Sequence, residues 1–336
     1  MHTTYHDAAY AQDYHPRVSG GPSQEDSVIE AHHLTKRYGD KVAVDDLSFA
    51  VRPGIVTGFL GPNGSGKSTT MRMITGLDHP TGGWATVNGQ HYHDLAWPLR
   101  EVGALLEATA IHPGRSARAH LRMLAEANRI PLRRVDELLD LVGLASVAGQ
   151  RAGKFSLGMS QRLGIAAALL GDPGALIFDE PVNGLDPDGI RWVRNLLKRL
   201  AAEGRTVFVS SHLMSEMALT ADEVVVIGRG RFLAHQPIAE MTAKSTASFV
   251  RVRSPQLERL RAALDKQGAR TALVGGALIV RGVDTEAIGD LAASLPVTLH
   301  ELSSESASLE EAFMELTEES IEYHGTLDEP AQGAHR

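Results

Sequence analysis

The sequence predicts an α/β fold built around a phosphate-binding loop and followed by a small α+β unit. Three observations support this prediction. A strand, a glycine-rich loop and a helix follow one another over residues 54–74. A second apolar strand ends in two acids at residues 175–180, and strand and helix patterns alternate again beyond residue 245. The chain has 336 residues, which is enough for one large domain and a smaller one.

The glycine-rich loop has the sequence Gly-Pro-Asn-Gly-Ser-Gly-Lys-Ser-Thr at residues 61–69, with the spacing of a P-loop. Glycines let backbone N–H groups turn toward an anion, and the following helix adds its positive N-terminal end. Lys67 is placed to reach the β- and γ-phosphates, and Ser68 to ligate Mg²⁺. A plain glycine-rich turn is the alternative. A dinucleotide-binding loop is excluded because Lys-Ser-Thr follows Gly66.

The second block is the apolar segment 175–178, which ends in Asp179 and Glu180. Phosphoryl transfer needs charge neutralisation by a metal and an oriented nucleophile. Asp179 is placed to bind the Mg²⁺ shell through water, and Glu180 to polarise an attacking water. Two solvated acids closing a strand are the alternative, but the following segment Pro-Val-Asn-Gly-Leu-Asp-Pro favours the catalytic interpretation.

The third block is Phe-Ser-Leu-Gly-Met-Ser-Gln-Arg at residues 155–162, which opens an apolar helix over 163–170. By itself this segment is typical of an N-cap serine followed by a core helix. Taken in order with an aromatic at Tyr38, the P-loop, the acidic strand and a strand ending in His212, it resembles the ATP-binding subunit of ABC transporters. The resemblance covers residues 28–242.

The resemblance implies an ATPase that uses ATP and Mg²⁺. Tyr38 would stack on adenine, and Ser156 and Gly158 would contact the nucleotide held by an opposing subunit. Glu180 and His212 would be catalytic. Mg²⁺ would be ligated by Ser68, Glu107 and Asp179. The phosphates would be held by Gly61, Pro62, Asn63, Gly64, Ser65, Gly66, Lys67, Ser68 and Thr69.

Two positions depart from the common family pattern. The signature, usually Leu-Ser-Gly-Gly-Gln, reads Phe-Ser-Leu-Gly-Met here, so Met159 replaces a hydrogen-bonding glutamine. Glu107 stands in the coupling loop where the family usually has Gln, and it adds negative charge near the phosphates. Both departures resemble those of drug- and antibiotic-resistance exporter ATPases of the bacitracin and daunorubicin types.

Composition restricts the partners. The net charge of −8 argues against a nucleic-acid partner bound by bulk electrostatics. The absence of cysteine excludes disulfides and Cys-based metal sites. No uncharged apolar run reaches the roughly 18 residues needed to span a bilayer, and the N-terminus lacks an apolar signal core. We therefore expect a cytoplasmic protein that reaches the inner face of the membrane through a partner.

Pattern shifts divide the chain. Residues 1–27 are polar and aperiodic, and we expect a disordered tail. The ATP-binding domain would occupy 28–242, a small α+β domain 245–320 and a second disordered tail 321–336. In the ATP-binding domain we expect paired strands over 28–51, a helical subdomain over 116–144, an amphipathic helix over 188–202 and core strands over 206–210 and 224–227.

Residues beyond 245 predict a ferredoxin-like unit. Strands over 248–253, 271–274, 277–280 and 297–302 are interleaved with helices over 255–267 and 285–294, which gives the order β-α-β-β-α-β. A closing helix follows over 308–316. Its start carries Ser308 and Glu311 in the spacing of a capping box.

The expected function is that of a homodimer, or a dimer with a paralogue, that hydrolyses ATP to power export through a separate membrane permease. The cargo class would be a drug, an antibiotic or a lipid. One alternative is a cytosolic ABC ATPase that drives no transport. A second alternative is a nucleotide-dependent switch with negligible turnover, against which the intact Glu180 and His212 argue.

Overall fold

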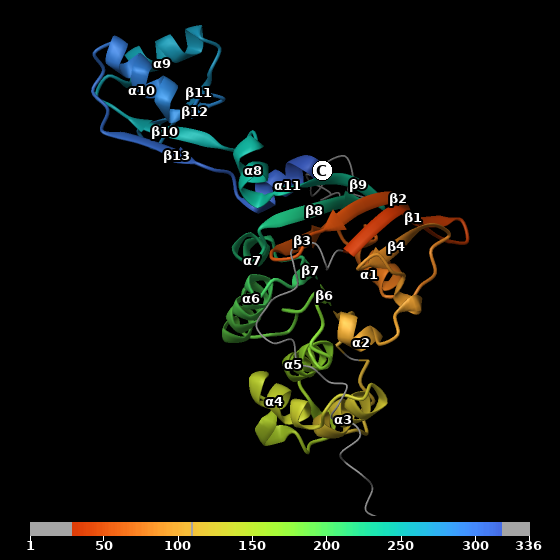
Figure 1. The fold of residues 1–336 in the computed structure, drawn as a ribbon. Helices are drawn as coiled ribbons and strands as arrows, with labels where there is room; N and C mark the ends of the chain where they lie inside the picture. Colours follow the sequence, from red (N-terminus) through yellow and green to blue (C-terminus); the bar gives the residue numbers. More distant parts are fainter. Residues whose placement is uncertain (1–28, 109, 318–336) are drawn as a thin grey trace, which may run out of the picture.

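The computed structural model describes residues 29–108 and 110–317. The tails predicted at 1–27 and 321–336 lie outside these residues. Within them the chain forms three sheets with helices between and around them (Figure 1). The elements form two groups, an N-terminal unit built around the largest sheet and a C-terminal unit that extends to one side of it (Figure 1). The predicted α/β fold with an added α+β unit is confirmed.

The central sheet has six strands in the order β5-β6-β7-β3-β8-β9. The first five run parallel, and β9 is antiparallel to β8. Buried residues predominate in the five parallel strands, as expected for a sheet covered on both faces, whereas β9 has none. The strands are β3 (Val56–Leu60), β5 (Val102–Leu105), β6 (Ala175–Asp179), β7 (Thr206–Ser210), β8 (Glu223–Gly228) and β9 (Arg231–Pro237).

Helices cover this sheet on both faces. The predicted helix after the P-loop is confirmed as α1 (Lys67–Ile74), and the amphipathic helix as α6 (Pro187–Ala202), whose Leu196, Leu197 and Leu200 are buried. The remaining helices near the sheet are α2 (Pro98–Glu101), α7 (Met214–Thr220) and α8 (Ile238–Lys244). Short 3₁₀ turns lie at Tyr92–Asp94, Ala145–Val147 and Ala152–Lys154.

A three-stranded antiparallel sheet packs beside the central one. Its order is β2-β1-β4, with β1 (Ile29–Tyr38), β2 (Lys41–Val51) and β4 (Gly82–Val87). The predicted pairing over 28–51 is confirmed for the residues described. Phe49 of β2 packs against Phe59 of β3 and Phe208 of β7 with ring centroids 5.6 and 5.5 Å apart. These contacts join the two sheets in one core.

The helical stretch predicted over 116–144 is two helices, α3 (Ala117–Ala127) and α4 (Arg133–Leu141). Pro131 explains the break, because it disfavours helical backbone in the preceding residue. Ser116 caps α3 by accepting a hydrogen bond from Ala119 N. Both helices pack on α5 (Leu157–Ala168), and the three form the lower part of the molecule in Figure 1.

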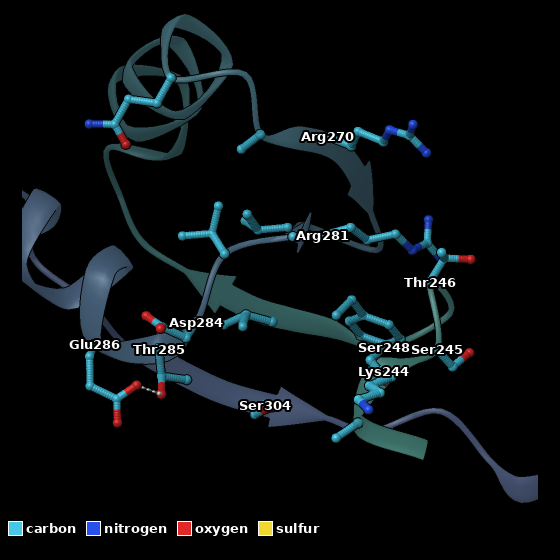
Figure 2. A pocket seen from close by; sticks show the side chains of 18 of the residues that line it. Lys244, Ser245, Thr246, Ser248, Arg270, Arg281, Asp284, Thr285, Glu286 and Ser304 are labelled. Atoms are coloured by element: carbon cyan, nitrogen blue, oxygen red, sulfur yellow. Dashed lines mark hydrogen bonds between the residues drawn. The ribbon is translucent and has the colours of Figure 1, made fainter. Parts of the chain in front are cut away.

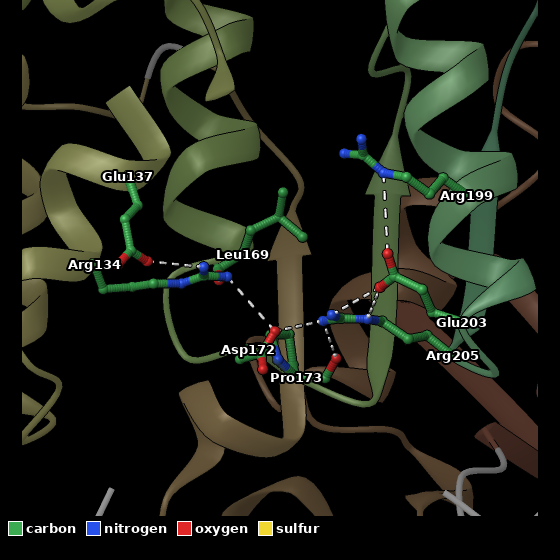
Figure 3. Close-up of polar contacts among 8 residues, drawn as sticks. All are labelled: Arg134, Glu137, Leu169, Asp172, Pro173, Arg199, Glu203 and Arg205. Atoms are coloured by element: carbon green, nitrogen blue, oxygen red, sulfur yellow. Dashed lines mark hydrogen bonds and ion pairs between the residues drawn. The ribbon is translucent and has the colours of Figure 1, made fainter. Parts of the chain in front are cut away.

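An ion-pair chain joins this helical part to the central sheet (Figure 3). Asp172, in the loop between α5 and β6, forms ion pairs with Arg134 of α4 at 3.5 Å and with Arg205, just before β7, at 2.9 Å. Arg205 also pairs with Glu203 at 3.0 Å. The Asp172 carboxylate is four-fifths buried and therefore links α4 to the edge where β6 and β7 begin.

The C-terminal unit has the strand order β11-β12-β10-β13, in which all neighbours are antiparallel. This is the arrangement expected from the ferredoxin-like order of its elements. Helices α9 and α10 pack against β11, β12 and β13, and their apolar residues share one core. The elements are β10 (Phe249–Arg253), α9 (Leu257–Lys266), β11 (Arg270–Val274), β12 (Ala277–Arg281), α10 (Thr285–Ser294) and β13 (Glu301–Glu305).

One feature of this unit differs from the sequence pattern, and another agrees with it. The strand predicted over 297–302 begins only at Glu301, because Val297 is used as a core residue in the loop after α10. The closing helix α11 (Leu309–Thr317) has the predicted capping box, in which Ser308 N donates to Glu311 Oε2 at 2.8 Å. This helix packs on α7 and α8 of the N-terminal unit, and Phe313 belongs to that unit's core.

Candidate functional site

The candidate site lies at the carboxyl edge of the parallel strands. Strands β5, β6, β7 and β3 all run in the same direction, so the residues that follow them meet at one edge. This places the loop at 61–66 after β3, Glu180 after β6, His212 beyond β7 and Glu107 beyond β5 along one side of the sheet. The structure therefore brings the P-loop and the acidic strand together with His212 and Glu107.

The P-loop is held in a defined shape. Lys67, the first residue of α1, is buried, and its Nζ donates to Gly61 O at 2.6 Å and to Pro62 O at 3.1 Å. Burial lowers the pKa of Lys67, while the charges of Glu180 and Asp179 oppose that effect. The ammonium group is thus positioned inside the loop with two carboxylates nearby, and it can exchange its bonds to loop carbonyls for bonds to phosphate oxygens.

Two local features fit a phosphate group inside this loop. Ser65 Oγ is buried and has no hydrogen-bond partner among the described residues. Gly66 caps α1 with a φ of 102°, and a Cβ there would lie 2.5 Å from Ala43 O of β2. Only glycine fits this position, so the loop backbone can lie close against β2.

A hydrogen-bonded chain connects the ends of β6 and β7. Asp179 and Ser210 are register partners in these two strands. Ser210 Oγ donates to Asp179 Oδ1 and accepts from Glu180 N at 3.0 Å. One hydroxyl therefore fixes the Asp179 carboxylate and the backbone of Glu180 together.

Glu180 is oriented from several sides. Its Oε2 lies 2.7 Å from His212 Nδ1 and accepts from His212 N at 3.3 Å. Its carbonyl accepts from Gln161 Nε2 of α5 at 3.1 Å. Glu180 adopts a φ of 51°, which is uncommon for a residue other than glycine and turns the chain sharply out of β6. The carboxylate, 26% exposed, faces the same edge as Lys67 and can accept a proton there.

Tyr38 lies at the end of β1, half exposed, with its ring available for a flat ligand. Its hydroxyl donates to Asp78 Oδ2 at 3.1 Å, and Asp78 also pairs with Arg72 of α1 at 2.8 Å. Burial and the bond to Asp78 raise the pKa of Tyr38. Lys36 Nζ stands 5.0 Å from the centre of the ring. The tyrosine is therefore tethered to the helix that begins in the P-loop.

The signature segment is separate from this set. Ser156 is the N-cap of α5, and its Oγ accepts from Met159 N at 3.2 Å. A Cβ on Gly158 would lie 3.1 Å from Gly184 O, so the loop after Glu180 rests against the start of α5. Within residues 29–108 and 110–317, no hydrogen bond or ion pair joins Ser156 to the P-loop. The Glu107 side chain is exposed at the site's edge.

Comparisons with known proteins decide the family. The family described as ABC transporter matches residues 44–183. An uncharacterized ABC transporter ATP-binding protein of Bacillus subtilis is 35% identical over 300 residues, which cover 88% of this chain and 98% of that protein. The chain belongs to the ABC transporter ATP-binding proteins. As a member of this family it is an ATPase.

Other relatives carry names that state a transport role. The bacitracin transport ATP-binding protein of Bacillus licheniformis is 41% identical over 222 residues, covering 65% of this chain and 72% of the relative. The Nod factor export ATP-binding protein I of Burkholderia orbicola is 33% identical over 300 residues, covering 86% and 96%. The resemblance to the antibiotic exporter type of ABC ATPase is thereby confirmed.

Solved structures agree with the fold. The ATP-binding subunit of an ABC transporter superposes with a TM-score of 0.59 and 28% identity, over 64% of this chain and 91% of that one. A bacterial ABC transporter cassette solved as a dimer gives a TM-score of 0.56 at 25% identity, over 62% and 98%. Residues 248–310 match a second family, described as a domain of unknown function.

Three residues of this ABC ATPase site were not expected to take part. Ser210 bridges Asp179 and Glu180, Gln161 holds the Glu180 carbonyl, and Asp78 anchors Tyr38. Ser210 could have been found from the sequence, because it ends a strand that must neighbour the acidic one. Gln161 and Asp78 could not, since their roles depend on how α5 and the α1–β4 loop pack.

Proposed function

We propose that this ABC ATPase powers the outward transport of a drug-like, antibiotic or lipid molecule through a separate membrane permease. The observation that carries the proposal is the paired Glu180 and His212 beside Lys67, in a chain related to proteins named for bacitracin transport and Nod factor export. A site equipped for turnover supports an energy-coupling role over that of a passive nucleotide switch.

In the proposed reaction Lys67 and the loop at 61–69 bind the β- and γ-phosphates. Glu180 accepts the proton of the attacking water, and His212 orients the Glu180 carboxylate. Mg²⁺ would be held by Ser68, by Asp179 through water and by Glu107, all oxygen donors as this ion prefers. The metal neutralises charge on the phosphates when it is bound.

The proposed working unit is a head-to-tail dimer, with a second copy or with a paralogue. Ser156 and Gly158 would complete the site of the other subunit, which is consistent with their separation from the P-loop of their own chain. Relatives of known structure include a dimeric cassette. Closure on ATP and opening after hydrolysis would drive the permease.

The proposed location is the cytoplasmic face of the cell membrane, through the permease. None of the helices in the described part of the chain is long and apolar enough to cross a membrane. We also propose that the chain has no nucleic-acid partner, because its net charge of −8 would repel the phosphate backbone.

Purification from membranes tests the coupling to transport. The tagged chain and its Glu180→Gln variant are isolated from detergent-solubilised membranes of the source cells, and co-purifying proteins are identified by mass spectrometry. We expect both to retain one polytopic membrane protein, and only the wild type to transport when reconstituted with it in lipid vesicles. A wild-type chain that hydrolyses ATP but retains no membrane protein would contradict the proposal and favour a cytosolic ABC ATPase.

A further inference from the structure

The C-terminal unit contains a cleft of about 760 Å³ that the ATPase chemistry does not use (Figure 2). The residues that lead into β10, the start of β11, the end of β12 and the start of α10 line it. Its volume lies in the range that small-molecule sites occupy, roughly 300–1,000 Å³. The lining combines apolar side chains such as Val250 and Val280 with charged and hydroxyl groups.

Two arginines dominate the polar lining. Arg270 and Arg281 are register partners on the adjacent strands β11 and β12, so their side chains leave the same face of the sheet. Figure 2 shows both extending in the same direction, with Arg281 reaching toward Thr246. Like charges placed directly opposite each other across two strands are destabilising. This pair therefore has a cost that a bound anion would remove.

Within the described ranges, neither guanidinium group is directly paired with a carboxylate, although Glu311 of α11 is close enough for its charge to interact with that of Arg281. Arg281 instead stands 5.9 Å from the centre of the Phe249 ring, which helps to hold it at the cleft. The third cation of the lining, Lys244, is already paired with Glu240 at 2.5 Å.

The acids of the cleft lie apart from the arginines and have local roles. Asp284 caps α10 by accepting from Ala287 N at 2.8 Å. Glu286 accepts from the Thr285 hydroxyl at 3.1 Å. Figure 2 shows these residues on the opposite side of the cleft from Arg270 and Arg281. The arginine side therefore keeps its positive charge.

The cleft is also connected to the N-terminal unit, which contains the P-loop. Ser245 and Thr246, which form part of its wall, both bind the carboxylate of Glu315, with Ser245 Oγ donating at 2.8 Å. Glu315 lies on α11, which packs on α7, and α7 begins two residues after His212. A change in the wall at residues 245–246 can therefore reach the element that follows the catalytic histidine.

We propose that this cleft is a regulatory site for a small ligand with a carboxylate or phosphate group, clamped by Arg270 and Arg281, and that its occupancy is transmitted to the nucleotide site through Glu315 and α11. Paired guanidinium groups are well suited to such oxyanions, because each can donate two parallel hydrogen bonds.

Calorimetric titration of the full chain tests the clamp. A saturating non-hydrolysable ATP analogue with Mg²⁺ fills the P-loop, and inorganic phosphate, citrate and vesicles containing phosphatidylglycerol are the three probes. We expect at least one probe to bind once per chain, with affinity lowered about tenfold to a hundredfold in Arg270→Gln/Arg281→Gln. The matched control is Arg259→Gln, an exposed arginine of α9 outside the cleft, which should bind as the wild type does.

The three probes separate a soluble phosphate, a soluble carboxylate and a lipid headgroup as the source of the anion. Binding of none of them, or equal binding by wild type and double variant, would overturn the proposal. The double variant removes a like-charge pair and should melt no lower than wild type. Should it fail to fold, the single variant Arg270→Gln provides the same comparison.

Transmission is tested by the ATPase rate with and without the binding probe. We expect the probe to change the wild-type rate severalfold, and to lose this effect in Glu315→Gln while binding persists. A probe that binds but leaves the wild-type rate unchanged would overturn the regulatory part of the proposal. Because binding is measured apart from transport, these outcomes do not depend on the permease.

Discussion

At the scale of single residues, three hydrogen-bonding partners fix the backbone and the carboxylate of Glu180. Ser210 binds its backbone N–H, Gln161 binds its carbonyl and His212 binds its side chain. A carboxylate fixed in this way loses little orientational freedom when it accepts the proton of an attacking water molecule. A substitution that changes only the Glu180 carboxylate is therefore the most direct test of the proposed proton transfer.

We expect Glu180→Gln to lower ATP turnover by about 10²–10⁴-fold, because an amide cannot accept the proton of water. The amide oxygen can still accept from His212, so the fold and ATP binding should be retained, and ATP should now hold a dimer. Gel filtration with ATP and Mg²⁺, together with a steady-state ATPase assay, measures both effects. Glu137→Gln, an acid of α4 far along the chain from the site, is the control; wild-type turnover in Glu180→Gln would remove Glu180 from the mechanism.

Glu107 is exposed at the same edge of the sheet, where the family usually has Gln. If it tunes coupling, Glu107→Gln should keep basal ATPase within a few-fold, since an amide oxygen can still accept from metal-bound water, and should weaken stimulation by the permease. If it ligates Mg²⁺ directly, the Mg²⁺ requirement should rise sharply. ATPase assays against Mg²⁺, with and without permease in lipid, distinguish the two. No change in either assay would leave Glu107 as a solvated acid.

At the scale of elements, the buried carboxylate of Glu223 connects strands β3, β8 and β9 with the end of β2. Glu223, the first residue of β8, is bonded by Arg52 at 2.5 Å, Thr57 of β3 at 3.1 Å and His235 of β9 at 3.0 Å. Burial alone would raise the pKa of Glu223, but the bonds from His235, Arg52 and Thr57 outweigh it and lower the pKa to about 2. The cluster lies at the opposite edge of the sheet from the nucleotide site.

This cluster predicts a loss of stability in acid. The folded-state pKa of Glu223 lies below its ordinary value of 4.5, so its contribution is complete above 4.5 and is lost as the pH falls toward 2. A shift of this size corresponds to roughly 3 kcal/mol. Glu223→Gln should therefore lower the free energy of unfolding by about 2–4 kcal/mol at neutral pH and by roughly half of that or less near pH 3.

Urea unfolding of wild type and variant at both pH values measures this difference. Glu240→Gln, which breaks the exposed pair with Lys244, is the matched control and should cost less than about 1 kcal/mol. An equal loss for Glu223→Gln at neutral pH and at pH 3 would show that the carboxylate charge is not what stabilises the cluster.

At the scale of the whole molecule, the arrangement of the signature helix bears on the assembly. Ser156 begins α5 in the helical part, whereas the P-loop begins α1 beside the antiparallel sheet. The two ends of the proposed nucleotide site therefore belong to different parts of the molecule, and in the proposed head-to-tail dimer a second subunit would bring them together.

We expect Ser156→Arg to abolish hydrolysis while leaving ATP affinity of the monomer nearly intact, because the bulky cation blocks closure on the partner's nucleotide. Lys67→Ala should abolish tight ATP binding in its own chain. Mixing the two variants should restore about one working site per heterodimer in an ATPase assay. A mixture of Lys67→Ala with the double variant Ser156→Arg/Lys67→Ala has no intact site and is the control. Activity no higher than that of either parent would count against the shared-site arrangement.

The sequence by itself determined the parts whose structure follows from neighbours along the chain. The P-loop and α1, the acidic strand, and the caps at Ser156 and Ser308 could be predicted because backbone conformation and capping depend on a few adjacent residues. The same reasoning gave the ferredoxin-like order, although the last strand begins later than predicted because Val297 is buried as a loop residue.

Only the tertiary structure decided which distant segments meet. The hydrogen bond from Ser210 to Asp179 requires β7 to neighbour β6 in a specific register, and the position of Arg270 opposite Arg281 requires the register of β11 on β12. The packing of α11 on α7 and α8 likewise depends on the burial of Phe313 in the core of the N-terminal unit. These contacts join residues far apart in sequence, and their free energy comes from packing and pairing that no local pattern encodes.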